Sequence, residues 1–278
     1  MAFAVNSRKE ILILTIGFLG GDRRMEIAAD WIKREGHTVR VCKEGVPKNA
    51  FFAALELLVL PYPATRDGVH IAATALPFSR LPLSPEAALF GGRLPDAWRE
   101  GRRSFDAEEN EAYLLENACL TAAAGVATVL RATERALYGV SAAVIGYGRI
   151  GKETARLLRA LGADTAVYAR REAAVSEARG DGHRAYLLSQ TPQIPETVVF
   201  GTVPAPADSL SSLLVAEEAL VYDLGGGLPV AMDTPSGKSI PTLPLRSAPG
   251  VFAPKAAGEA YGRCVLAALS HMERNDTL

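Results

Sequence analysis

The chain has 278 residues, of which 49% are hydrophobic and 22% are charged, and 30 Lys and Arg face 31 Asp and Glu for a net charge of −1. This length suits one large domain or two ordinary ones, and the composition is that of a globular protein. A near-neutral chain without a basic stripe argues against nucleic acid or a membrane surface as a partner. Three scattered cysteines, Cys42, Cys119 and Cys264, lack metal or redox spacing, so we expect reduced thiols in a cytoplasmic protein.

An apolar run over residues 11–19 follows Arg8 and Lys9 and imitates the start of a signal peptide. Residues 20–24 then read Gly-Gly-Asp-Arg-Arg, without a small-residue cleavage site, and the run is too short to span a bilayer. We therefore expect a first buried strand over residues 11–16 and no membrane-spanning run elsewhere.

The first strand leads into a glycine-rich turn over residues 17–22, a helix over 23–35 and a strand over 38–42. Helical periodicity places four apolar side chains on one face of that helix, namely Met25, Ala28, Ala29 and Ile32. This βαβ order predicts that the first half of the chain is Rossmann-like. Its turn is either an anion cradle beside Arg23 and Arg24 or a plain crossover.

A third strand is expected over residues 55–60 and opens into a proline-rich loop over 61–68. In an open α/β sheet, ligands bind beyond the carboxyl ends of the strands. Thr65 and Arg66 are therefore candidates for holding a substrate carboxylate, although a solvated loop also accounts for them. The elements expected next are a strand over 89–91, a helix over 95–101 and an alanine-rich helix over 107–135 that could break near Asn117.

The strongest pattern lies at the centre of the chain, where residues 146–151 read Gly-Tyr-Gly-Arg-Ile-Gly. An apolar strand over 143–145 precedes this turn, a helical pattern follows it, and a second strand is expected over 165–168. This order is what a dinucleotide-binding βα unit requires. The three glycines permit the tight turn, the approach of a pyrophosphate and close helix packing, in that order. We predict that the whole turn contacts the cofactor: Gly146, Tyr147, Gly148, Arg149, Ile150 and Gly151.

The end of the second strand indicates which dinucleotide binds. An NAD site usually has an acidic residue there, which holds the ribose 2′-hydroxyl. This chain has Arg170 and Arg171 instead. Because guanidinium groups match phosphate oxygens, we expect the 2′-phosphate of NADP as their partner. The alternative is that both arginines are ordinary solvated charges.

The other expected elements are a helix over 172–180, strands over 185–188, 197–200 and 219–224, and a last helix over 256–272. A turn over 201–205 follows the second of these strands, and its Val203 and Pro204 would face the nicotinamide ribose. Asp223, at the end of the third strand, is a further cofactor contact. The glycines at 225–227 indicate either a close backbone approach or a flexible loop.

Several motifs along nearly the whole chain carry a resemblance to one family. They are Gly20-Gly21-Asp22, Leu60-Pro61 with Ala64-Thr65, the glycine turn at 146–151, Ala169-Arg170, Asp223-Leu224, and Ala-Pro-Gly with Ala-Pro-Lys-x-Ala-Gly at 248–258. In this order they resemble the A subunit of dipicolinate synthase. The glycine turn is shared with many dehydrogenases, whereas the first and last motifs are more selective.

The resemblance implies oxidation of dihydrodipicolinate to pyridine-2,6-dicarboxylate with NADP, beside a flavoprotein-like B subunit, in the mother-cell cytoplasm of a sporulating bacterium. It also implies the fold of D-2-hydroxyacid dehydrogenases, which is α/β with two Rossmann-like domains, parallel sheets and a C-terminal helix that returns to the first domain. The expected division is 1–115 plus 253–278 against 116–252. Assembly into a homo-oligomer is left open.

A substrate with two carboxylates calls for cations in its site. Lys255 is our catalytic candidate, either as a carboxylate clamp or as a proton-transfer group, because an ammonium near a helix N-terminus opposes the helix dipole. Arg23 and Arg66 are weaker candidates for the clamp, and a solvated lysine is the alternative.

The four histidines, His37, His70, His183 and His271, show no metal spacing and no nearby carboxylate, so we expect surface or packing roles and no metal site. The His–carboxylate pair usual in hydroxyacid dehydrogenases is missing from the last third of the chain. Two other functions stay open: an NADP-dependent dehydrogenase of another small carboxylate, and a non-catalytic NADP-binding subunit that docks a flavoprotein partner.

Overall fold

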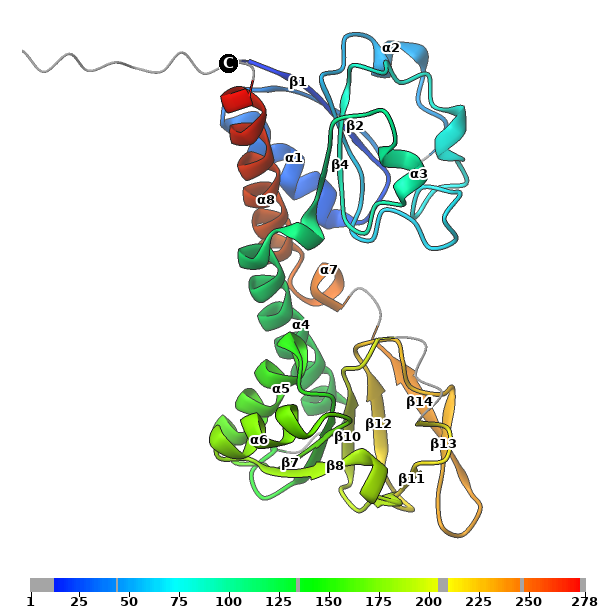
Figure 1. Ribbon diagram of the computed structural model, residues 1–278, viewed down its shortest axis with the longest axis vertical. Coiled ribbons are helices and arrows are strands. Elements are labelled where there is room, and N and C mark those ends of the chain that lie inside the picture. Colours follow the sequence, from blue (N-terminus) through cyan, green and yellow to red (C-terminus); the bar gives the residue numbers. More distant parts are fainter. Residues whose placement is uncertain (1–12, 44, 134–135, 205–209, 246–247, 276–278) are drawn as a thin grey trace, which may run out of the picture. The chain divides into compact units, whose positions relative to one another are not determined.

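The computed structural model describes residues 13–43, 45–133, 136–204, 210–245 and 248–275 (Figure 1). The chain divides into two compact units, Met1–Tyr113 with Pro254–Leu278 (unit 1) and Leu114–Ala253 (unit 2). The expected division, 1–115 plus 253–278 against 116–252, differs from this one by one or two residues at each boundary. Each unit is built on a largely parallel sheet with helices, and the last helix belongs to unit 1. The predicted fold class, α/β with two Rossmann-like domains, is confirmed.

Unit 1 contains β1 (Thr15–Leu19), α1 (Arg23–Arg34), β2 (Thr38–Cys42), α2 (Asn49–Phe52), β3 (Leu57–Val59), β4 (Ala88–Gly91), α3 (Asp96–Arg99), β5 (Ser104–Asp106) and α8 (Pro254–Asn275). Its strands pair in parallel in the order β2-β1-β3-β4-β5. This is the 2-1-3-4-5 order of a doubly wound sheet, so the strand order reverses between β1 and β3. Ligands bind such sheets at the carboxyl ends of the strands near that point.

Helices α1 and α8 pack side by side in unit 1 (Figure 1). A Cβ atom built on Gly258 would lie 2.6 Å from Ile27 Cβ and 2.9 Å from the Arg24 carbonyl oxygen. One built on Gly262 would lie 3.2 Å from Trp31 Cβ. Gly262 lies one turn after Gly258 on α8, and its contact Trp31 lies one turn after Ile27 on α1. The two helices therefore run in the same direction. Both begin at the carboxyl edge of the sheet.

Replacing Gly258 by Ala is expected to destabilise the chain by about 1–2 kcal/mol, because overpacking against the α1 backbone outweighs the better helix propensity of alanine. Gly262→Ala is the matched control, since its Cβ atom meets side-chain atoms at 3.2 Å that can shift. Chemical denaturation should show a lower midpoint for Gly258→Ala than for Gly262→Ala. Equal midpoints would contradict the close approach of the two helices.

Unit 2 contains β6 (Ser141–Ile145), α5 (Arg149–Ala160), β7 (Asp164–Ala169), α6 (Glu172–Gly180), β8 (Arg184–Leu187), β9 (Gln193–Ile194), β10 (Val198–Gly201), β11 (Leu214–Val215), β12 (Leu220–Asp223), β13 (Ala231–Asp233), β14 (Ser239–Pro244) and α7 (Ala248–Phe252). The main sheet has the order β13-β14-β12-β10-β6-β7-β8. From β8 to β14 this is the 3-2-1-4-5-6 order of a dinucleotide-binding fold, with its switch point between β6 and β10. Only the edge pair β13–β14 is antiparallel within the described sheet.

Several predicted boundaries are wrong in the first strand. Strand β1 runs to Leu19, so Gly17 lies in the strand rather than in the following turn. The reason is packing: a Cβ atom on Gly17 would lie 2.8 Å from Leu55 Cδ1, so the glycine makes room for the segment before β3. Residues 11 and 12 of the expected strand lie outside the described residues.

The helices also differ from expectation at their ends. Helix α4 spans Glu111–Thr133 without a break at Asn117, and a short 3-10 helix over Ala107–Glu109 precedes it. Helix α8 begins at Pro254 rather than near Ala256, because proline is well suited to the first helical position. Residues 134–135 of the expected long helix lie outside the described residues.

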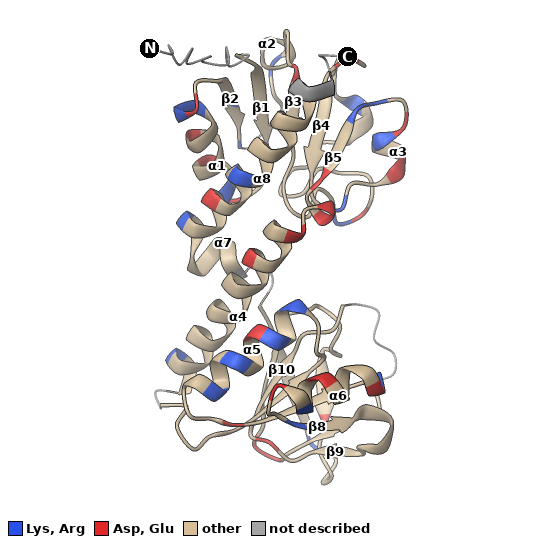
Figure 2. Cartoon of the chain, turned by 60° about the vertical axis from the view of Figure 1, so that its left-hand side comes forward, with Lys and Arg blue, Asp and Glu red and all other residues tan. Residues whose placement is uncertain are grey.

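Within the described residues, α4 is the one helix long and apolar enough to cross a membrane by length and composition, a possibility that the sequence reading missed. Half of its apolar window is buried inside the protein. A core helix of a soluble protein passes the same test, so this is weak evidence for a membrane span. Helices α1 and α5 both carry charged residues of both signs (Figure 2).

Candidate functional site

The glycine turn after β6 has the backbone geometry that its motif requires. Gly146 has a φ of +100°, in the region that favours glycine. A Cβ atom on Gly151 would lie 2.2 Å from the Gly146 carbonyl oxygen, so helix α5 packs onto the turn only because this residue is glycine. A Cβ atom on Gly148 would meet no heavy atom within 4 Å. The middle glycine therefore faces open space, where a pyrophosphate can approach the backbone.

The start of α5 suits an anion. Gly148 is its N-cap and supplies no side-chain hydrogen bond, so no side chain occupies the cap. Backbone N–H groups and the helix dipole at such an end favour negative charge. Arg149 and Ile150 form the first turn, where their backbone amides belong to this end.

The side chain of Tyr147 turns away from the glycine turn. Its hydroxyl donates a hydrogen bond to Asp181 Oδ2 at 2.7 Å, and its ring packs edge-on against His183. Burial and the bond to Asp181 raise the pKa of Tyr147. Only the backbone of Tyr147 therefore lies in the glycine turn, where a cofactor contact was predicted. Its side chain instead connects the end of α6 to the core.

Thr202, which no prediction singled out, ties the turn to the neighbouring strand β10. Its Oγ1 donates to the Ile145 carbonyl oxygen at 2.9 Å and lies 3.3 Å from that of Gly146. These contacts lie at the switch point between β6 and β10. A threonine directly after a buried strand was the sequence signal that could have identified it.

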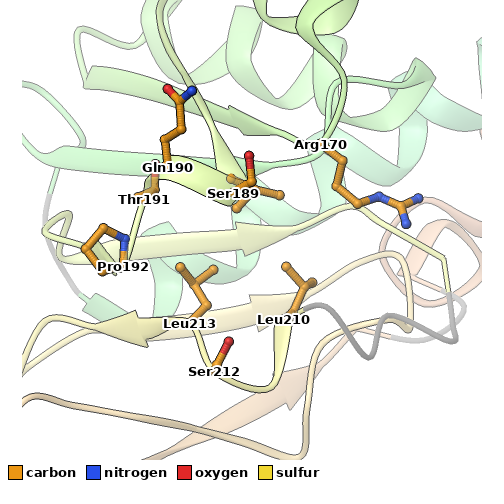
Figure 3. Close-up of a pocket in the computed structure, with 9 residues that line it drawn as sticks. Arg170, Ser189, Gln190, Thr191, Pro192, Leu210, Ser212 and Leu213 are labelled. Carbon is orange, nitrogen blue, oxygen red and sulfur yellow. The ribbon is translucent and has the colours of Figure 1, made fainter.

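Arg170 follows the last residue of β7 and lines an open pocket of 680 Å³ (Figure 3). Leu210 and Leu213 lie on one side of this pocket and Ser189 and Thr191 on the other. A pocket with apolar and hydroxyl walls and a guanidinium at one end suits a planar ring next to an anionic group. The pocket-lining residues after β8 and before β11 were not predicted, since the chain brings them together from distant segments.

Both arginines after β7 are exposed, and Arg171 is the N-cap of α6. Two other arginines of unit 2 have carboxylate partners, because Arg156 pairs with Glu153 and Arg184 with Asp164. Within the described part of the chain neither Arg170 nor Arg171 forms an ion pair. Their charges are therefore available to an anion.

Asp223 serves its own loop. The residue is only 6% exposed. Its carboxylate accepts backbone N–H groups from Gly225, Gly226 and Leu228 at 2.8–3.3 Å. Burial raises the pKa of Asp223, although these N–H bonds act in the opposite direction. We find this predicted cofactor contact committed to loop structure.

The glycines after β12 approach backbone, which was one of the two interpretations of their pattern. Cβ atoms on Gly225 and Gly227 would lie 2.2 and 2.5 Å from the Val203 carbonyl oxygen, and Pro204 bridges to Gly226. The predicted contacts Val203 and Pro204 are thus held at the end of β10 by this loop. Ala205, the last residue of the expected turn, lies outside the described residues.

The predicted substrate contacts of unit 1 lie on its carboxyl edge. Arg23 and Lys255 are exposed residues in the first turns of α1 and α8. Arg66 is exposed on the loop after β3. Among the described residues, Arg23, Arg66 and Lys255 form no ion pair, and their predicted roles stay predictions.

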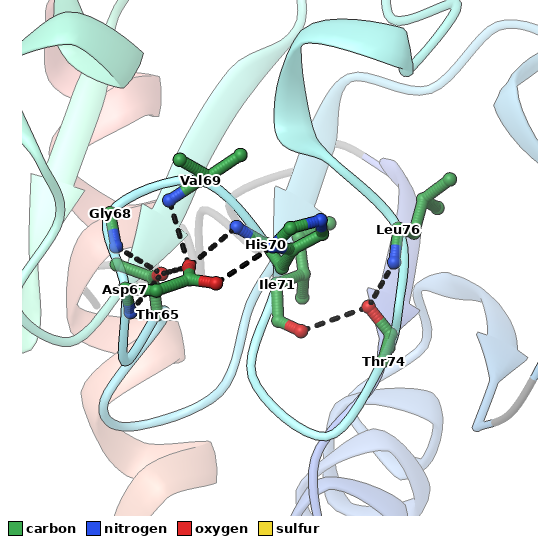
Figure 4. A network of polar contacts seen from close by, with 8 residues as sticks. All are labelled: Thr65, Asp67, Gly68, Val69, His70, Ile71, Thr74 and Leu76. Carbon is green, nitrogen blue, oxygen red and sulfur yellow. Dashed lines mark hydrogen bonds and ion pairs between the residues drawn. The ribbon is translucent and has the colours of Figure 1, made fainter.

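Thr65 belongs to a turn that its own side chain stabilises (Figure 4). Its Oγ1 accepts N–H groups from Asp67 and Gly68, while Asp67 accepts those of Val69 and His70. The His70 ring lies 2.7 Å from Asp67 Oδ2, so the expectation that no histidine has a nearby carboxylate is wrong. The bonds from His70 and Val69 lower the pKa of Asp67. The Thr65 hydroxyl is therefore occupied by the loop.

The anion cradle considered for the turn after β1 is occupied by protein. Asp22 is the N-cap of α1 and accepts the backbone N–H of Arg24 at 2.9 Å. The Arg24 guanidinium, with a side chain only 11% exposed, binds the same carboxylate through two nitrogens. The plain crossover is the better description. Within the described residues, no group of His, Cys, Asp and Glu could hold a metal ion.

With this geometry in place, comparison with known proteins identifies the domain. Residues 122–198 match the family of D-isomer specific 2-hydroxyacid dehydrogenases, NAD binding domain. Unit 2 has the dehydrogenase type of nucleotide-binding domain. The match supports an NAD(P)-dependent oxidoreductase with a nicotinamide cofactor. No match was found among curated proteins.

Solved structures resemble the chain over almost its whole length. The dipicolinate synthase A chain from Bacillus subtilis has a TM-score of 0.71 at 19% identity, covering 95% of this chain and 98% of its own. The corresponding dipicolinate synthase protein from Bacillus halodurans has a TM-score of 0.67 at 18% identity, covering 92% and 97%. NAD-dependent formate dehydrogenase from Staphylococcus aureus, in complex with NAD, has a TM-score of 0.56 at 11% identity, covering 94% and 96%. At such identities the likeness establishes the fold alone, and together with the matched domain it supports a D-2-hydroxyacid dehydrogenase-like fold.

Proposed function

We propose that the chain oxidises dihydrodipicolinate to pyridine-2,6-dicarboxylate with NADP as hydride acceptor. The observation that carries the cofactor half is the pair of arginines after β7, which form no ion pair with a described residue, beside a pocket that suits an adenine ring. The substrate half is supported by the motif resemblance and by the two dipicolinate synthase structures.

The residues fit the cofactor at two places, the pyrophosphate and the 2′-phosphate. The open backbone at Gly148 and the uncapped start of α5 would hold the pyrophosphate. Arg170 and Arg171 would hold the 2′-phosphate. When bound, NADP supplies the hydride acceptor, and the protein holds the substrate carbon against it and excludes water. One proton leaves with the hydride, and aromatisation favours the oxidation.

By the same resemblance we propose the cytoplasm of a sporulating mother cell as the location and, as partner, a flavoprotein-like B subunit. A non-catalytic role is the second candidate. It is favoured by the loop after β12, where Gly225 and Gly227 pack on the backbone at Val203 and the three glycines of the loop present no reactive side chain. A protein of this kind would bind NADP and dock the partner that performs the chemistry.

The assay uses the purified chain, NADP⁺ and freshly generated dihydrodipicolinate, with and without a candidate flavoprotein. We expect NADPH and dipicolinate to appear in equal amounts. Product only in the presence of the flavoprotein, with unchanged turnover by Lys255→Ala, favours the docking role. NADPH binding without either product, under every combination, would overturn the synthase proposal.

A further inference from the structure

Three side chains that no prediction included meet at the carboxyl edge of the unit 1 sheet. Tyr62 follows β3, Arg93 follows β4 and Glu108 follows β5. The Tyr62 hydroxyl donates to Glu108 Oε1 at 2.5 Å, and Arg93 Nε donates to the same oxygen at 2.7 Å. The guanidinium carbon of Arg93 lies 5.8 Å from the centre of the Tyr62 ring. We call these three residues the Tyr62–Arg93–Glu108 cluster.

The backbone at Arg93 is held in an unfavourable conformation. Its φ is +57°, which non-glycine residues rarely adopt, and such residues persist only where their surroundings fix them. The fixing group is Asp106, a residue only 8% exposed, whose carboxylate accepts the N–H groups of Arg93 at 2.9 Å and Leu94 at 2.7 Å. Asp106 thus fixes the backbone position from which the Arg93 side chain extends.

The neighbouring glycine serves the same arrangement. A Cβ atom on Gly92 would lie 1.8 Å from an atom of the Tyr62 ring, so the ring can lie across the loop only because residue 92 is glycine. Burial and the bond to Glu108 raise the pKa of Tyr62, so its hydroxyl remains a donor at neutral pH. Tyr62 and Glu108 therefore hold the Arg93 side chain from two directions.

The result is a guanidinium that is fixed and yet exposed. The Arg93 side chain is 64% exposed, whereas that of Arg24, which pairs with Asp22, is 11% exposed. An exposed arginine ordinarily samples many rotamers, and restraining it beforehand lowers the entropy lost when a ligand binds. A planar fork held in this way is suited to a carboxylate.

The place of the cluster agrees with this chemistry. It lies beyond the carboxyl ends of three adjacent parallel strands, where open α/β sheets bind their ligands. We propose that Arg93 binds a carboxylate of the substrate, with Tyr62 and Glu108 as positioning residues. That this is a carboxylate of dihydrodipicolinate rests on the proposed function.

The test compares three substitutions of Arg93 with a matched control in the full chain. Arg93→Gln removes the charge, Arg93→Lys keeps the charge without the fork, and Arg93→Gly removes the side chain at a φ that glycine adopts freely. Arg99→Gln is the control, because Arg99 pairs with Glu109 at 2.8 Å on the same unit but lies in a helix with ordinary backbone. Binding of pyridine-2,6-dicarboxylate is measured by calorimetry, and KM and kcat by NADPH formation.

We expect Arg93→Gln and Arg93→Gly to raise the Kd and the KM by about 10-fold or more, Arg93→Lys by less, and Arg99→Gln not at all. The Arg93→Gly chain should unfold at the same denaturant concentration as the native chain or a higher one. If Arg93 has a purely structural role, its variants should lose stability and keep the native Kd. That result would overturn the proposal.

Failure of the site and failure of the reaction remain distinguishable. Turnover of dihydrodipicolinate with unchanged KM in the Arg93 variants overturns the site and leaves the reaction standing. Arg93-dependent binding of pyridine-2,6-dicarboxylate, malonate or glutarate, without turnover, supports the site and counts against the reaction. If the native chain binds none of these acids, the proposed carboxylate site is wrong.

Discussion

The Gly151→Ala chain is expected to lose both stability and cofactor affinity. The added Cβ atom would lie 2.2 Å from the Gly146 carbonyl oxygen and 2.9 Å from Thr202 Oγ1, which is itself bonded to the backbone at Ile145. Because backbone atoms cannot move aside cheaply, α5 must shift away from the turn. We expect a loss of about 1–3 kcal/mol in the free energy of unfolding, from overpacking. Chemical denaturation measures it, and titration of NADPH fluorescence should show weaker binding by at least about 10-fold.

Gly148→Ala separates the two effects. No heavy atom lies within 4 Å of its added Cβ, and its φ of −92° suits any residue. Stability should therefore stay within about 0.5 kcal/mol of the native value, while NADPH affinity falls because the methyl group occupies the approach of the pyrophosphate. Gly180→Ala, whose Cβ also meets nothing within 4 Å, should change neither quantity much. A Gly151→Ala chain that unfolds and binds like the native one would refute the close approach.

The nucleotide-binding centre could be predicted because its signal is local. A buried strand, three glycines at fixed spacing and an amphipathic helix lie within one stretch of chain, and the structure places β6, the turn and α5 within a few residues of expectation. Helix α6 and strand β2 have the predicted bounds for the same reason. In each case the apolar period and the flanking breakers come from neighbouring residues.

Elements fixed by distant pairing could not be read in this way. Strands β5 and β13 have three residues each, too few to show a period, and they exist because β4 and β14 offer them a hydrogen-bonding edge. Because β5 was not predicted, the Tyr62–Arg93–Glu108 cluster could not be predicted either. Without that strand, nothing in the sequence brings Glu108 beside Arg93.

The candidate site shows the same division. Arg170 could be predicted because it directly follows a strand of the motif, whereas Leu210 and Leu213 reach its pocket from a segment 40 or more residues away. Asp223 lies at the end of a strand pattern, but the prediction missed that its carboxylate accepts the N–H groups of Gly225, Gly226 and Leu228 in the following loop. A polar residue at a strand end is therefore a site candidate only when its own loop leaves it free.

Replacing both Arg170 and Arg171 by Ala is expected to change cofactor preference. A hydrogen bond to a charged group contributes about 1.5–3 kcal/mol, so loss of two guanidinium groups should weaken NADPH binding by about 100-fold or more. NADH has no 2′-phosphate, so its affinity should change little. Fluorescence titration with each dinucleotide gives the ratio. Arg156→Ala is the control, because Arg156 is an exposed arginine of unit 2 that is paired with Glu153.

Arg170→Asp sharpens the same argument by reversing the charge at one position. An acidic residue at the end of the second strand accepts hydrogen bonds from the ribose 2′-hydroxyl and repels a 2′-phosphate. We therefore expect this variant to bind NADH more tightly than the native chain and NADPH more weakly. If both arginines are solvated charges, neither variant shifts the NADPH-to-NADH ratio more than Arg156→Ala does. That result would leave the nicotinamide site intact while removing the basis for NADP, because Arg170 and Arg171 are the groups on which that preference depends.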